Sequence, residues 1–138
     1  MFYWKPKSLW PVEKMKTKIL IVEDDALNMQ LLNDLLQAHG YETLQEVSGS
    51  GVVQMVKEKR PDLILMDIQL PVISGLELTK ILKEDEELKE IPIVAVTAFA
   101  LNGDEEKIRK GGCDGYIAKP FSISCLLETI AKLLNSHE

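Results

Sequence analysis

The chain lacks the signals of membrane, secreted and nucleic-acid-binding proteins. No apolar run approaches the roughly 20 residues that a membrane-spanning helix needs, and the first residues hold no apolar segment of the signal-peptide kind. Acidic residues outnumber basic residues by 22 to 16, and no basic stripe is present. Contacts to nucleic-acid phosphates require a surplus of lysine and arginine. We therefore predict a cytoplasmic protein that binds neither membranes nor nucleic acids.

Cysteine is also scarce. The two cysteines, Cys113 and Cys125, have neither a metal-binding nor a redox spacing. Because the chain has no secretory signal, we expect both thiols to be reduced. We predict that both are small side chains in buried or half-buried positions.

The length and composition are those of one domain with a substantial core. The chain has 138 residues, of which 46% are hydrophobic. Residues 1–15 differ from the rest, because they contain both tryptophans and two of the six prolines. We predict an irregular extension over residues 1–15 and a single domain over residues 16–138. Two other interpretations stay open: translation could start at Met15, or the extension could dock to a partner.

Short apolar runs alternate with segments of helical period. Three continuous runs, at residues 19–22, 63–66 and 93–96, are typical of strands buried on both faces. Weaker strand signals lie at residues 43–45 and 116–118. Apolar residues at three- and four-residue spacing predict helices between and after these strands. The positions that carry this pattern are Leu27, Leu31, Leu32, Leu35, Leu36, Val52, Val53, Val56, Leu76, Leu78, Ile81, Leu82, Ile123, Leu126, Leu127, Ile130, Leu133 and Leu134.

The helix ends have signals of their own. Gly40 stands where a left-handed cap would end the first helix, and Pro61 ends the second. Asn102 is a candidate cap for a short polar fourth helix, and Ser122 opens the fifth. Five strand–helix repeats predict an α/β fold, in which a parallel sheet has helices on both faces.

Residues suited to phosphoryl chemistry follow four of the five predicted strands. They are Glu23, Asp24 and Asp25 after the first strand, Asp67 after the third, Thr97 after the fourth and Lys119 after the fifth. The carboxyl ends of parallel strands meet at one edge, where such sheets bind ligands. Clustered carboxylates repel one another unless a cation shares the site, and hard oxygen ligands suit Mg²⁺. We predict a phosphoryl site with Asp67 as carboxylate nucleophile, Mg²⁺ on the acids, and Lys119 and Thr97 on the phosphoryl oxygens.

Each of these signals has an ordinary structural explanation when it is taken alone. Residues 23–25 could be acids of a first helical turn, which the helix dipole favours. Thr97 could simply end a strand, and Lys119 could shape a turn. Asp67 is harder to explain in this way, because a carboxylate gains nothing from packing at the end of an apolar strand. The combination of four strand ends favours the phosphoryl site.

With these residues, the chain resembles the response-regulator receiver domains of bacterial two-component systems. The resemblance covers residues 16–134 and rests on the segments ILIVEDD, PDLILMDIQLP, VAVTA and AKP. It implies the flavodoxin-like (βα)5 fold, with a five-stranded parallel sheet in the order 2-1-3-4-5. Within the family, the chain is most similar to single-domain regulators of cell division and polarity in alphaproteobacteria.

The resemblance implies a role for each residue of the predicted site. Asp67 is the phosphoryl acceptor, and Thr97 and Lys119 contact the phosphoryl group. The peptide bond between Lys119 and Pro120 is cis. Tyr116 is the switch aromatic, which turns inward as Thr97 moves toward the phosphoryl group.

The resemblance also implies the ligands of Mg²⁺. Asp67 and Asp24 bind the ion directly, Glu23 acts through water, and the backbone carbonyl of Gln69 completes the protein ligands. Asp25 departs from the family pattern, since it adds a third acid. A neutral residue at this position would crowd the site less.

Partners follow from the same resemblance. The donor is a sensor histidine kinase or a histidine phosphotransfer protein, and the signal leaves by contact with a downstream protein. The predicted kinase-docking residues are Leu27, Asn28, Leu31, Pro120 and Phe121, although for Leu31 burial in the core is the favoured interpretation. The protein is not an enzyme in the usual sense, since it catalyses only its own phosphotransfer and slow autodephosphorylation. Phe99, apolar near the path of the hydrolytic water, predicts a long-lived phosphoryl group.

Three rival interpretations are weaker. A phosphohydrolase of the haloacid dehalogenase type needs a second aspartate two residues after the nucleophile, and Gln69 stands there. A flavodoxin-like flavin binder needs a hydroxyl- and glycine-rich phosphate loop after the first strand, where this chain has three acids. A receiver that has lost phosphorylation would lack part of the site, and every required residue is present.

Overall fold

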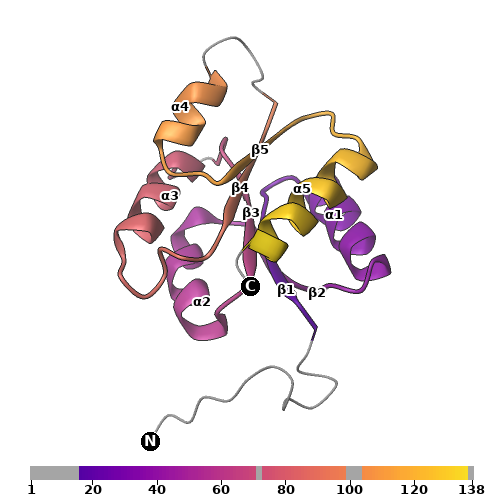
Figure 1. Ribbon diagram of the computed structural model, residues 1–138, viewed down its shortest axis with the longest axis horizontal. Helices are drawn as coiled ribbons and strands as arrows, with labels where there is room; N and C mark the ends of the chain where they lie inside the picture. The colour runs from indigo at the N-terminus through magenta and orange to yellow at the C-terminus, as the bar shows by residue number, and fades with distance from the viewer. Residues whose placement is uncertain (1–15, 71–72, 99–103, 137–138) are drawn as a thin grey trace, which may run out of the picture.

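The computed structural model describes residues 16–70, 73–98 and 104–136 and contains a single five-stranded parallel sheet in the described part (Figure 1). The strand order is β2-β1-β3-β4-β5, as predicted. The strands are β1 (Lys18–Val22), β2 (Glu42–Glu46), β3 (Leu63–Asp67), β4 (Ile93–Thr97) and β5 (Gly115–Ala118). Each covers one of the predicted runs, and the two weaker predictions, at residues 43–45 and 116–118, are confirmed as well.

Helices follow every strand and cover both faces of the sheet. They are α1 (Ala26–Ala38), α2 (Val52–Lys59) with the short 3-10 turn η3 (Gly49–Gly51) before it, α3 (Gly75–Glu84), α4 (Asp104–Lys110) and α5 (Ile123–Ser136). Helices α1 and α5 lie on one side of the sheet, and α2, α3 and α4 lie on the other (Figure 1). No helix of the described residues is long and apolar enough to cross a membrane.

Local signals set the helix ends. The Asp25 carboxylate caps α1 by accepting a hydrogen bond from the Asn28 backbone N–H at 3.0 Å. Gly40 has φ +89°, the left-handed conformation predicted for the end of the first helix. Ser122 accepts from the Cys125 backbone N–H at 3.1 Å, so the predicted start of the last helix is confirmed. The predicted cap Asn102 lies outside the described residues.

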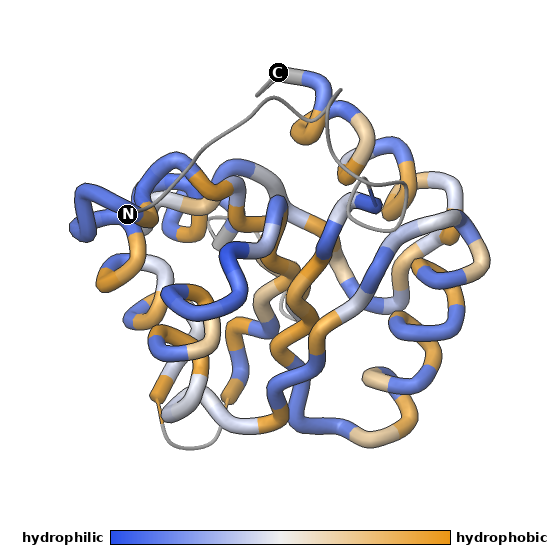
Figure 2. Tube along the Cα trace, turned by 90° about the horizontal axis from the view of Figure 1, so that it is seen from below, coloured by the Kyte–Doolittle hydropathy of each residue, from blue (hydrophilic) through white to orange (hydrophobic). Residues whose placement is uncertain are grey.

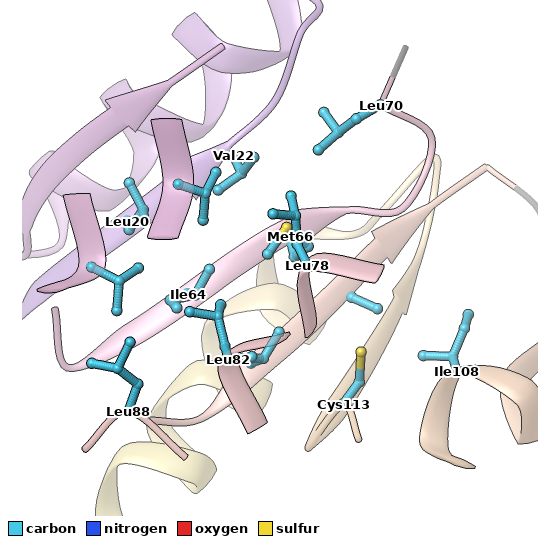
Figure 3. Close-up of a cluster of buried hydrophobic side chains, with 14 residues drawn as sticks. Leu20, Val22, Ile64, Met66, Leu70, Leu78, Leu82, Leu88, Ile108 and Cys113 are labelled. Atoms are coloured by element: carbon cyan, nitrogen blue, oxygen red, sulfur yellow. The ribbon is translucent and has the colours of Figure 1, made fainter. Parts of the chain in front are cut away.

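The core consists of two layers separated by the sheet. Because successive strand residues point to opposite faces, Leu20, Val22, Ile64 and Met66 pack with α2, α3 and α4 (Figure 3). Their neighbours along the strands pack with α1 and α5 in the other layer. These neighbours are Ile19, Ile21, Leu63 and Leu65. Apolar stretches accordingly gather along the central strands in Figure 2. We call the two layers the α2–α3–α4 layer and the α1–α5 layer.

Four predictions of burial are wrong. Leu31 is 51% exposed, so the favoured interpretation of this residue as core is not correct. Ile81 and Ile123 belong to the predicted apolar faces of their helices but are also exposed, at 44% and 53%. Cys113 is buried as predicted, whereas Cys125 is exposed, and both thiols are free. For Leu31, Ile81 and Ile123 the reason is that periodicity marks an apolar stripe, whereas the neighbouring elements decide how much of the stripe is covered.

A polar cluster stabilises the amino-terminal edge of the sheet, opposite the predicted site. The Lys83 ammonium lies 2.7 Å from the Asp114 carboxylate and also donates to the Lys89 and Ile91 backbone carbonyls at 3.1 Å. The Asp114 carboxylate accepts a further bond from the Ile93 backbone N–H at 2.9 Å. This cluster joins α3, the loop before β4 and the loop before β5.

Candidate functional site

The residues of the predicted phosphoryl site lie at the carboxyl edge of the sheet. Asp67 and Thr97 are the last residues of β3 and β4, and both are buried. Glu23, directly after β1, is 2% exposed. The Lys119 ammonium lies 2.7 Å from a Glu23 carboxylate oxygen and 3.7 Å from an Asp67 carboxylate oxygen. Residues from four strand ends therefore lie together, as the sequence predicted.

The chain around Asp67 holds its carboxylate in one orientation. The Gln69 backbone N–H donates to Oδ1 of Asp67 at 2.9 Å, so the other oxygen is the one that lies toward Lys119. Helix α3 begins very close to this turn. A Cβ atom on Gly75 would lie 2.3 Å from the Asp67 carbonyl oxygen, nearer than nonbonded atoms can approach. Glycine at position 75 is therefore required for this close packing.

Lys119 is positioned by its backbone as well as by its charge. Its backbone N–H donates to the Thr97 carbonyl at 2.7 Å, which continues the pairing of β4 with β5. The Lys119–Pro120 peptide bond is cis, as predicted. The backbone hydrogen bond to Thr97 and the ion pair with Glu23 hold the ammonium group beside the two buried acids.

Three carboxylates form a candidate metal site. One oxygen each from Glu23, Asp24 and Asp67 lies within 4.8 Å of the others, and Asp24 is exposed to solvent. An all-oxygen set with few protein ligands fits Mg²⁺, which keeps several waters when bound. Asp25 does not crowd this site, because its carboxylate caps α1 instead. The role predicted for the Gln69 carbonyl stays a prediction.

Burial changes the acidity of Glu23. Removal from water and the neighbouring Asp67 raise the pKa of its carboxyl group, Lys119 lowers it, and together they bring this pKa to about 7. The pKa of Glu23 is thus well above the value of 4.5 of an ordinary glutamate.

This raised pKa predicts a pH-dependent stability in the absence of metal. Between pH 5 and 7 the Glu23 carboxyl group binds more protons in the folded protein than in the unfolded chain, where it ionises near 4.5. The free energy of unfolding should therefore fall by about 1–2 kcal/mol as the pH rises across this range in EDTA. Urea unfolding at several pH values, followed by circular dichroism, measures it.

Two variants isolate the contribution of Glu23 to this slope. Glu23→Gln should flatten the pH dependence, because the amide does not titrate. Glu128→Gln, which removes an exposed carboxylate from α5, should leave the slope unchanged. An unchanged slope in Glu23→Gln would contradict the assignment.

Tyr116, the predicted switch residue, lies on β5 beside the site. Its side chain is half-buried and packs against the α2–α3–α4 layer. It pairs in register with Ala95 of β4, two residues before Thr97. The role of Tyr116 as a switch residue and its movement stay predictions.

A groove opens beside Lys119 on the α1–α5 side. Its volume is about 350 Å³, and it is lined by Asn28, Leu31, Ala98, Lys119, Pro120 and Phe121. Four of the five predicted docking residues are in this set, and the fifth, Leu27, is 77% exposed on α1. We call this feature the docking groove.

The sequence missed two features of the site. It did not reveal the ion pair of Glu23 with Lys119, since 96 residues separate them and no local pattern links them. It also missed the close approach of Gly75 to Asp67, for which the only signal was a glycine at the start of a helical pattern.

Comparison with known proteins identifies the family. The model of the response regulator receiver domain matches residues 19–131, so the chain belongs to the response-regulator receiver family. The chain is 57% identical to the polar-differentiation response regulator DivK of Brucella ovis over 120 residues, which cover 87% of this chain and 98% of the relative. DivK of Brucella anthropi is 56% identical over the same coverage.

Solved structures agree with this assignment. A receiver domain of a sensor histidine kinase from Pseudomonas aeruginosa, with magnesium coordinated in its active-site cleft, has a TM-score of 0.81 and 33% identity, covering 87% of this chain and 98% of that one. The chemotaxis response regulator CheY4 of Vibrio cholerae has a TM-score of 0.80 and 27% identity, covering 86% of this chain and 98% of that one. The flavodoxin-like receiver fold is thus confirmed.

Proposed function

We propose that this receiver accepts a phosphoryl group on Asp67 from a histidine kinase or a histidine phosphotransfer protein, and that it works as a single-domain regulator in the cytoplasm. The observation that carries the proposal is the position of Lys119 beside two buried acids at the end of the sheet. A buried nucleophilic carboxylate next to a cation and a buried hydroxyl group has the parts that phosphoryl transfer requires.

The acids would hold the metal ion. Asp24 and Asp67 would bind Mg²⁺ directly, Glu23 through water, and the Gln69 carbonyl would complete the protein ligands. When bound, Mg²⁺ neutralises charge on the phosphoryl oxygens and on the attacking carboxylate. The oxygen-only ligand set supports this assignment, and so does the magnesium ion in the related receiver from Pseudomonas aeruginosa.

The chain's own residues would perform the remaining chemistry. The Asp67 carboxylate oxygen that lies toward Lys119 attacks phosphorus, a P–O bond forms, and the P–N bond to the donor histidine breaks, leaving its electron pair on the imidazole nitrogen. Lys119, now paired with Glu23, would turn its ammonium group to a phosphoryl oxygen. The Thr97 hydroxyl group would donate to another oxygen.

The movement of Thr97 would pass the signal on. Tyr116 would turn inward as Thr97 approaches the phosphoryl group, and this would remodel the surface of α4, β5 and α5. Phosphorylation shifts the population between two conformations of this surface. A downstream protein would read the surface by direct contact.

The docking groove would receive the kinase. It lies next to Lys119 and so opens beside the acceptor site, and its lining is largely apolar. A donor helix or loop that packs on Leu27, Leu31 and Phe121 would bring its histidine to Asp67.

The biological role that the relatives support is control of cell polarity and division. Two regulators named for polar differentiation share more than half of their residues with this chain over nearly their whole length. We propose that the downstream partner belongs to that process.

Acetyl phosphate tests the central proposal without a kinase. Purified protein incubated with Mg²⁺ and acetyl phosphate should gain one phosphoryl group, about 80 Da by intact mass spectrometry. Asp67→Asn should show no gain, because the amide is not a nucleophile. Asp25→Asn is the matched control and should gain the group as the parent does, since Asp25 caps α1 instead of binding the metal.

Two results would contradict the proposal. A mass gain that persists in Asp67→Asn would place the phosphoryl group on another residue. An unmodified parent protein that still binds Mg²⁺ would show that these side chains do not perform the chemistry.

The phosphoryl group should be long-lived once it is formed. Phe99, the apolar residue behind this prediction, lies outside the described residues. After removal of acetyl phosphate, the phosphorylated mass should decay over minutes or longer. A half-life of seconds would show that the hydrolytic water reaches the site freely.

A further inference from the structure

The fold leaves an apolar strip on α1 without a covering element in the described part of the chain. Leu27 and Leu31 are 77% and 51% exposed. They are four residues apart on a helix, so they lie on the same side, one turn from each other. Leu31 also lines the docking groove with Phe121. Strip and groove thus form one apolar surface, and contiguous surfaces of this kind mark binding sites.

Residues 1–15, which the structure does not describe, have the side chains that would cover this surface. They contain Phe2, Tyr3, Trp4 and Trp10, half of the eight aromatic residues of the chain. Burial of an aromatic side chain is favourable because it removes roughly 150–250 Å² of surface from water. The family match begins at residue 19, so the receiver fold itself does not account for them. The volume of the docking groove, about 350 Å³, lies in the range of roughly 300–1,000 Å³ that holds ligands.

Charge favours the same pairing. Residues 1–15 contain three lysines and one glutamate, in a chain whose net charge is −6. Asp24 and Asp25 are exposed at the start of α1, and Asp34 is exposed farther along it. A basic segment is therefore attracted to the surface that carries Leu27 and Leu31.

The length of the segment allows the contact. The described chain begins at Lys16, two residues before β1. Strand β1 spans about 17 Å, and α1 turns back from the carboxyl end of this strand. Leu31 therefore lies about 8 Å along α1 from the start of the helix, in the direction of the start of β1. Extended chain covers up to about 3.5 Å per residue, so Trp10 can reach about 20 Å from Lys16 and Trp4 about 40 Å.

We propose that residues 1–15 bind the docking groove and the Leu27–Leu31 strip of the same chain, with a tryptophan side chain in the groove. The contact would compete with the histidine kinase for this surface and so regulate docking. That consequence rests on the proposed function, whereas the contact itself does not.

Tryptophan fluorescence tests the contact in the full chain. Trp4 and Trp10 are its only tryptophans, so the emission reports on residues 1–15 alone. The emission maximum of the folded protein should lie at a shorter wavelength than that of the protein unfolded in urea. Acrylamide should quench the emission of the folded protein less. The double variant Leu27→Ser, Leu31→Ser should move the emission toward that of the unfolded protein.

Ile81→Ser is the matched control. Ile81 is an exposed apolar side chain on α3, across the sheet from α1, and its replacement should leave the emission unchanged. Circular dichroism checks that all variants fold. Folded protein that emits as the unfolded chain does would overturn the proposal, as would an equal shift in Ile81→Ser. A shift that depends on protein concentration would also overturn it, because a second copy would then supply the segment.

The acetyl phosphate assay reads Asp67 and is independent of this fluorescence. Failure of the contact and failure of the proposed function would therefore be seen separately.

Discussion

Gly75→Ala should destabilise the protein by about 2–3 kcal/mol, the usual cost of forcing a group into a packed site. The new Cβ atom would lie 2.3 Å from the Asp67 carbonyl oxygen and 2.8 Å from Ile68 Cα, and both of these are backbone atoms. Since neither can rotate away, either the turn after β3 or the start of α3 must move. Alanine stabilises a helix by about 1 kcal/mol relative to glycine, so a net loss of stability would reflect the clash. Urea unfolding measures the change.

The same substitution should slow phosphorylation by acetyl phosphate, because the displaced turn carries the Asp67 carboxylate. Gly51→Ala is the matched control. Its Cβ atom would meet the carboxylate end of Glu46 at 2.8 Å, and that flexible side chain can turn aside. The control should change the free energy of unfolding by less than about 1 kcal/mol. Equal effects of the two variants would show that the loss in Gly75→Ala does not come from the contact with Asp67.

Asp114→Ala should also lower the free energy of unfolding by about 2–3 kcal/mol, although Asp114 lies at the other end of the sheet. The substitution removes the carboxylate partner of Lys83 and the acceptor of the Ile93 backbone N–H. The ion pair is partly exposed, so we expect less than the 3–5 kcal/mol typical of breaking a fully buried pair. Thermal or urea unfolding at neutral pH tests the prediction.

A double-mutant cycle with Lys83→Met separates the ion pair from the other contacts. We expect the two losses to be less than additive, since the residues share one interaction. Glu106→Ala, which breaks the exposed pair of Lys110 with Glu106 on α4, should change stability by less than about 0.5 kcal/mol. Fully additive losses would show that Lys83 and Asp114 stabilise the fold independently.

The sequence was sufficient to predict the sheet and the site edge. Buried parallel strands are continuous apolar runs, so Leu63–Asp67 and Ile93–Thr97 could be located within a residue or two. The topology then brings strand ends together, which is sufficient to predict that Asp67 lies beside Lys119. The domain boundaries and the catalytic roles stay predictions.

The side-chain partners could not be predicted from the sequence. Asp25 looked like an extra acid of the metal site, yet its carboxylate caps α1. Leu31 and Ile123 fit their helical stripes but remain exposed, because a stripe does not reveal how wide the covering element is. The ion pair of Lys83 with Asp114 depends on the packing of α3 against the loop before β5, which periodicity does not encode.

The division of the core by the sheet gives the molecule two mutational neighbourhoods. Side chains such as Leu36 and Ile130 in the α1–α5 layer share no cluster with Val56 and Leu82 in the α2–α3–α4 layer. Substitutions in opposite layers should therefore combine additively. The α1–α5 layer, on whose side the docking groove opens, can thus change in sequence without altering the layer that contains the packing partners of Tyr116.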